Sequence, residues 1–286
     1  FVLNDVEEAG YFYHDLVQIN GEGQTLFFPS SYRRAIKYGQ KDAGNEILRT
    51  EVLNRLQKGE NVCVVTYPDA LAEKVVSQKD LATHTIQLKV GQRVETDTLM
   101  EKLFAHGFEQ VDYVYEPGQY ALRGSILDVY SYASEYPYRI DFFGDEIDSI
   151  RTFEVETQLS KEKKTNVSIV PELVGMEGGE FVSFFDFLSG TALLGMKDFL
   201  WIRERMDAIH QETVSPQAIE AADEEHREEL VRMQSRLMDG SGFTMKALEF
   251  QRMEFGNKPT GVPQASLAFD VAVQPIFHKN FELVST

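Results

Sequence analysis

The sequence predicts an α/β protein in which a parallel-sheet domain is split by an inserted α+β domain with an antiparallel sheet. Residues 1–86 alternate short apolar strands with helical segments, which is typical of a parallel sheet covered by helices. Over residues 87–172 the pattern changes to longer strands with a period of two, as in antiparallel sheets. Residues 173–286 return to mixed strands and helices. We therefore expect residues 1–86 and 173–286 to be the two parts of one domain.

Local signals support the first part of this division. Asp5 is a favourable N-cap for the amphipathic helix that follows it. The segment Gly44–Gly59 has apolar residues one turn apart and ends at a lysine followed by glycine, a common helix C-terminus. The run Asn61–Tyr67 predicts a buried strand, and Pro68 suits the first turn of another helix. Because Cys63 lies inside that run, we expect a buried thiol.

The inserted segment begins with a short strand and a helix. Ile86–Lys89 reads as the strand, and Asp97–His106 as the helix, which a following glycine closes. Tyr138–Phe143 and Ile147–Glu156 then predict a hairpin around a Gly-Asp turn. We interpret Lys161–Thr165 as a charged exit from this domain.

The last part is less regular. Its expected elements are a strand at Thr191–Met196, a helix at Leu200–Ile209, a long charged helix at Pro216–Met238, a glycine break at Gly240–Gly242 and a strand at Ser266–Val273.

Composition excludes several classes of function. The formal charge of -18 argues against a surface for duplex DNA on this chain, because phosphate contacts use clustered Lys and Arg. With one cysteine there is no internal disulfide, which fits a reducing compartment. We find neither a signal segment nor an apolar run of the roughly 18 residues that a membrane helix needs. We expect a cytoplasmic protein without membrane contact, and the strand-like start without Met suggests a fragment of a longer chain.

Motifs for nucleotide or metal chemistry are missing, so we expect no catalytic residues, cofactor or metal in this chain. A P-loop needs closely spaced glycines, a lysine and a hydroxyl residue at a helix start, and no glycine-rich segment here combines them. Asp223-Glu224-Glu225-His226 imitates a helicase metal-binding box, but its charged helical context predicts a solvated helix face. The six histidines have no metal-site spacing.

One strand carries an unusual second face. In Tyr138–Phe143, alternation places Arg139, Asp141 and Phe143 on the side opposite the core residues. Arginine beside a large exposed aromatic residue is typical of a binding hot spot. Arg123, on the preceding strand, joins this patch if the strands are neighbours. Alternatively, Phe143 caps the hairpin turn and both arginines pair with Asp141 or Glu146.

An ordered series of short motifs resembles a known family, the module shared by the nucleotide excision repair protein UvrB and the transcription-repair coupling factors (Mfd). The resemblance is strong over about residues 86–172 and weaker but collinear from residue 1. The absent P-loop favours the coupling factors over UvrB. The motifs are Glu116-Pro117-Gly118, Leu122-Arg123-Gly124, Leu127-Asp128-Val129, Tyr138 through Ile147, Ser149-Ile150-Arg151 and Thr157 through Ser160.

The resemblance implies a function and site residues. It implies a degenerate P-loop, RecA-like fold for the split domain and an inserted domain that binds UvrA through Arg123, Arg139 and Phe143. It further implies a full-length ATP-dependent DNA translocase, with ATP and Mg²⁺ bound elsewhere, that displaces stalled RNA polymerase. The alternatives are a module that binds damaged DNA directly, an ATP-dependent helicase or nuclease subunit, and a structural spacer in which these three residues only pack internally.

Overall fold

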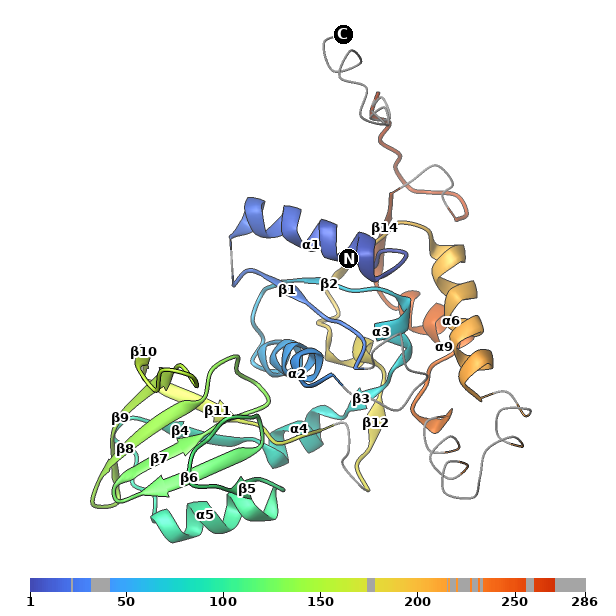
Figure 1. The fold of residues 1–286 in the computed structure, drawn as a ribbon. Coiled ribbons are helices and arrows are strands. Elements are labelled where there is room, and N and C mark those ends of the chain that lie inside the picture. Colours follow the sequence, from blue (N-terminus) through green and yellow to red (C-terminus); the bar gives the residue numbers. More distant parts are fainter. Residues whose placement is uncertain are drawn as a thin grey trace, which may run out of the picture.

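The computed structural model describes residues 1–21, 23–31, 42–173, 178–214, 216, 220, 227, 231, 234–255 and 260–270. Its chain forms a mixed α/β fold with two lobes (Figure 1). The first lobe combines the beginning of the chain with residues from beyond 180, and the second contains the green middle segment (Figure 1).

Parallel strands from both ends of the sequence meet in the first lobe. Strand β1 pairs with β2, and β13 pairs with β14, in each case in parallel. Val2 lies between the two pairs, with parallel bridges to Thr66 and Met196. Residues 1–3 therefore join the pairs into one array. The strands are β1 (Thr25–Phe27), β2 (Cys63–Val65), β13 (Leu193–Met196) and β14 (Gln251–Glu254).

Helices cover this array, and their ends follow from local chemistry. The Asp5 carboxylate accepts hydrogen bonds from the amides of Glu7 and Glu8 and so begins the first helix. Asp42 caps the second helix in the same way. Gly240 begins the last described helix where a Cβ atom would lie 2.5 Å from the Arg203 carbonyl, so glycine permits close packing. The helices are α1 (Val6–Asn20), α2 (Ala43–Gln57), α3 (Pro68–Ala72), α6 (Phe199–Val214), α9 (Gly240–Ala247) and the short η1 (Phe184–Phe187).

Two antiparallel pairs connect the lobes. The chain leaves the first lobe through β3 (Val75–Val76), α4 (Gln78–His84) and β4 (Ile86–Lys89). It returns through β11 (Asn166–Ile169), which pairs with β4, and β12 (Phe181–Val182), which pairs with β3. The outward and return segments therefore lie side by side.

The second lobe is built on a six-stranded sheet with the order β10-β9-β8-β7-β6-β5. All neighbours are antiparallel except β5 and β6. Helix α5 (Thr96–Ala105) packs on one face through Leu99 and Leu103, which share a core with Leu127, Ile140 and Ile150. The strands are β5 (Glu109–Gln110), β6 (Gln119–Arg123), β7 (Ile126–Val129), β8 (Tyr138–Phe143), β9 (Glu146–Phe153) and β10 (Ser160–Lys164).

Three local expectations were wrong. The Lys161–Thr165 segment is largely strand β10, because pairing with β9 satisfies its backbone while its charged side chains stay at the sheet edge. Gly240–Gly242 forms the first turn of α9 and not a break between elements, since the Asp239 side chain accepts a hydrogen bond from the Gly242 amide. Cys63 is only half-buried, and the Asn20 side chain donates to its sulfur at 3.8 Å.

Other expectations concern the last part of the chain. Residues 266–270 of the expected strand Ser266–Val273 are exposed and form no strand, and the remainder lies outside the described residues. Most of the expected helix Pro216–Met238, including the Asp223–His226 motif, also lies outside them. Among the described helices, none has the length and apolar character needed to cross a membrane.

Candidate interaction surface

Strand register places the three predicted residues on one face of the six-stranded sheet. Arg123 on β6 lies opposite Ile126 on β7, which in turn lies opposite Asp141 on β8. Arg139 and Phe143 lie two residues to either side of Asp141, so their side chains share that face. The alternate residues of β8 are buried in the core on the side of α5. Arg123 and Arg139 therefore lie on the same face of the sheet, as predicted.

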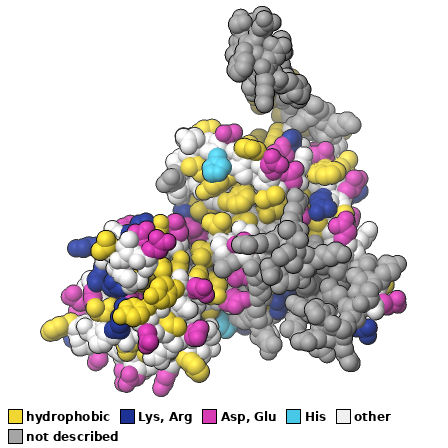
Figure 2. Space-filling model, viewed as in Figure 1, with side chains coloured by type: hydrophobic (Ala, Val, Ile, Leu, Met, Phe, Trp, Pro, Cys, Tyr) yellow, Lys and Arg dark blue, Asp and Glu magenta, His cyan; other side chains and the backbone are white. Residues whose placement is uncertain are grey.

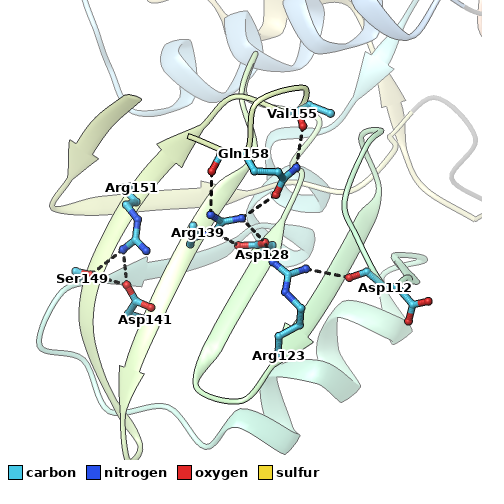
Figure 3. A network of polar contacts seen from close by, with 9 residues as sticks. All are labelled: Asp112, Arg123, Asp128, Arg139, Asp141, Ser149, Arg151, Val155 and Gln158. Atoms are coloured by element: carbon cyan, nitrogen blue, oxygen red, sulfur yellow. Dashed lines mark hydrogen bonds and ion pairs between the residues drawn. The ribbon is translucent and has the colours of Figure 1, made fainter. Parts of the chain in front are cut away.

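A buried carboxylate, Asp128, joins the two arginines (Figure 3). It lies on β7, directly opposite Arg139, and the residue is 0% exposed. Arg139 donates to it through two nitrogens, at 2.7 and 2.8 Å, in the planar geometry that suits guanidinium and carboxylate. Arg123 donates to the same carboxylate at 2.5 Å. The partner of both arginines is thus Asp128, not Asp141 or Glu146.

Arg139 is held from several sides. Its guanidinium also donates to the backbone and side-chain oxygens of Gln158, at 3.2 and 3.0 Å, and lies 4.2 Å from the ring centroid of Phe153. Gln158 adopts a left-handed backbone conformation, with φ of 58°, that orients both oxygens. The side chain of Arg139 is only 14% exposed. Its hydrogen bonds to Asp128 raise the pKa of Arg139 further, so the charge is permanent.

Arg123 is more accessible. Its side chain is 36% exposed and lies 5.0 Å from the ring centroid of Tyr113, which is itself 53% exposed. It also donates to the Asp112 carbonyl at 2.9 Å (Figure 3). Asp128, Asp112 and Tyr113 therefore hold the guanidinium in place while one edge stays open to solvent.

Phe143 is the most exposed of the three residues. It ends β8 at the hairpin turn and lies opposite Glu146 on β9. Gly144 follows it with φ of 62°, as the tight turn requires. Its ring is 84% exposed, so the residue contributes little to the folded core. An aromatic side chain in this position is available to a partner.

Two cross-strand rows define the charge of this face. One row runs Ala121, Asp128, Arg139, Arg151, Lys163, and the other runs Arg123, Ile126, Asp141, Ser149. Together they hold four cations and two carboxylates, in a chain of net charge -18. Arg151 contacts Asp141 by an ion pair (Figure 3). In Figure 2, Lys and Arg side chains are visible on this lobe. The surplus of positive charge favours an acidic partner surface.

Sequence reasoning missed the residues that organise this face. A signal for Asp128 existed, because a carboxylate between Leu127 and Val129 in a buried strand needs cationic partners. Gln158 carried no such signal, since its role depends on a left-handed conformation far along the chain. Over the part of the chain that the structure describes, no three His, Cys, Asp or Glu side chains gather as a metal site would require.

Residues 86–173 match the family model described as the UvrB interaction domain. This segment forms the second lobe and carries the entire face described above. The resemblance that the short motifs indicated is thereby confirmed.

Curated proteins that match part of the chain are named transcription-repair-coupling factor. That of Escherichia coli (strain K12) is 37% identical over 123 residues, which are 43% of this chain and 11% of the relative. That of Bacillus subtilis (strain 168) is 29% identical over 170 residues, 59% of this chain and 14% of the relative. That of Haemophilus influenzae is 34% identical over 123 residues, which again are 43% of this chain and 11% of the relative. The chain thus spans a small fraction of the length of these relatives.

Proposed function

We propose that this chain is the UvrA-recruiting module of a transcription-repair coupling factor and acts in transcription-coupled nucleotide excision repair by binding another protein. The matched UvrB interaction domain and the names of the relatives support this assignment. The observation that carries it is Phe143, a large apolar side chain 84% exposed beside an arginine-rich face within that domain.

The three candidate residues have different roles in this proposal. Phe143 fills a pocket on UvrA and excludes water around the neighbouring polar contacts. Arg123 presents its open edge to carboxylate or carbonyl groups of UvrA. Arg139, at 14% exposure, acts chiefly by fixing Asp128 and thereby Arg123.

The first lobe is proposed to be a degenerate P-loop, RecA-like domain made of residues 1–86 and 173–286. The parallel bridges of Val2 to Thr66 and Met196 support the joining of these two parts. Ser30 and Ser31 follow β1, where a P-loop would cradle phosphate, and both donate hydrogen bonds to the buried carboxylate of Glu73. An anionic side chain in this position disfavours phosphate, which supports a module without catalysis.

Other activities are assigned to the longer protein. By this proposal its remaining domains bind ATP and Mg²⁺, move along DNA and displace stalled RNA polymerase. The present chain contributes recruitment of UvrA, in keeping with its net charge of -18, which opposes direct binding to duplex DNA.

Arg123→Ala tests the proposed contact. We expect calorimetric titration with UvrA to show saturable binding to the native chain and roughly tenfold or greater weakening in the variant. Arg252→Ala is the matched control, because Arg252 lies 5.2 Å from the ring centroid of Phe199 and pairs with Glu254, but belongs to the other lobe. Equal affinity of both variants and the native chain would exclude Arg123 as a contact.

A further inference from the structure

A polar cavity of about 460 Å³ lies between the two lobes, near Tyr138 at the opposite end of β8 from Phe143. The C-terminal part of helix α2 lines one side through Asn54 and Lys58, and the end of β10 with the following turn lines the other through residues 163–166. Arg123, Arg139 and Phe143 do not line this cavity, although Lys163 also belongs to one of the charged rows described above. The inference below is therefore independent of that function.

Asn54 is the first sign of a ligand site. The residue is only 8% exposed and lines the cavity, yet its side-chain amide makes no hydrogen bond to any residue that the structure describes. The amide is not sealed from solvent in the cavity, so water can serve as its hydrogen-bond partner. A ligand that enters the cavity can therefore accept hydrogen bonds from this amide in place of water.

The charges around the cavity identify the chemistry of that partner. Lys58, Lys163 and Lys164 line it together with one carboxylate, Glu162. The ammonium of Lys164 already pairs with Glu162 at 2.7 Å, whereas no described residue pairs with Lys58 or Lys163 through its side chain. The C-terminal end of α2 carries a partial negative charge of about half an elementary charge. This charge is smaller than the net positive charge of two from the lining side chains. The cavity is thus electropositive in an acidic chain.

We propose that this cavity binds a phosphate group. Lysine ammonium groups bind phosphate well because their positive charge is compact. The Asn54 amide can donate directional N–H hydrogen bonds to the phosphate oxygens. The hydroxyl of Thr165 and the amide of Asn166 border the same space. The volume also admits a molecule larger than a single phosphate. The source of the phosphate group is either a small phosphorylated compound or the backbone of a nucleic-acid strand.

Titration of the full chain with inorganic phosphate, followed by ¹H–¹⁵N NMR at constant ionic strength, tests the site. We expect saturable shifts of the Asn54 side-chain amide and of backbone amides in residues 163–166. Asn54→Leu and Lys58→Gln should each weaken phosphate about tenfold or more. Lys79→Gln removes the charge of an exposed lysine on α4, outside the cavity, and should leave the affinity unchanged.

A short oligothymidylate distinguishes the two sources. If the oligonucleotide competes with phosphate for the native chain but not for Lys58→Gln, the site is assigned to a nucleic-acid backbone. If the oligonucleotide leaves the phosphate affinity unchanged, the site is assigned to a small phosphorylated compound. The proposal is overturned if phosphate shifts no more resonances than chloride does. It is also overturned if Asn54→Leu and Lys58→Gln, with native spectra elsewhere, bind phosphate as the native chain does.

Discussion

Asp128→Asn is expected to lower the free energy of unfolding by roughly 3 to 5 kcal/mol, the usual cost of removing one member of a buried ion pair. The carboxylate is 0% exposed and accepts from Arg139 and Arg123, so the variant leaves two guanidinium groups partly without an anion. Urea denaturation followed by circular dichroism measures the change. The effect is large chiefly because Arg139, at 14% exposure, cannot turn to bulk water without losing its contacts with Gln158 and Phe153.

Asp141→Asn is the matched control for that experiment. Asp141 pairs with Arg151 on the same face, but both side chains are 25% exposed. Solvent screens this pair, so we expect a loss below about 1 kcal/mol. If Asp128→Asn were no more destabilising than this control, Asp128 would not be the organising group of the face.

Phe143→Ala is expected to weaken UvrA binding by about 2 to 4 kcal/mol, or roughly 30- to 1,000-fold in Kd, without loss of stability. The ring is 84% exposed in the free chain, so its removal creates no cavity in the core. Calorimetry gives the affinity, and the melting temperature shows that the fold is kept.

Phe104→Ala provides the control for that substitution. Phe104 is 74% exposed and lies on α5, which covers the opposite face of the sheet. Its replacement removes the same amount of apolar side chain from the same lobe. Equal weakening by both variants would indicate nonspecific hydrophobic contact, and the proposed face would be wrong.

Much of the fold could be predicted from local signals. The start of α1 follows from Asp5, and the end of α5 from Gly107, whose φ is 82°. The β8–β9 hairpin follows from alternation around Gly144. Long-range pairing could not be predicted, because the bridges of Val2 to Thr66 and Met196 depend on packing between distant segments.

The candidate site could be predicted only in part. Alternation correctly placed Arg139 and Phe143 on one face, since the strand period is two. It could not distinguish a buried arginine from an exposed one. Burial of Arg139 depends on Asp128 from β7, Phe153 from β9 and Gln158 from the next loop. Only their spatial arrangement supports the proposed positioning role of Arg139 and contact role of Phe143.

Hydrogen–deuterium exchange of the chain, measured alone and in the presence of UvrA, tests the central claim most directly. Contact through the arginine-rich face predicts slower exchange in residues 123–126, 143–146 and 155–160, which border Arg123, Phe143 and Gln158. Helices α1 and α6 of the other lobe should exchange at unchanged rates. Protection confined to that lobe, or no protection at saturating UvrA, would contradict the account.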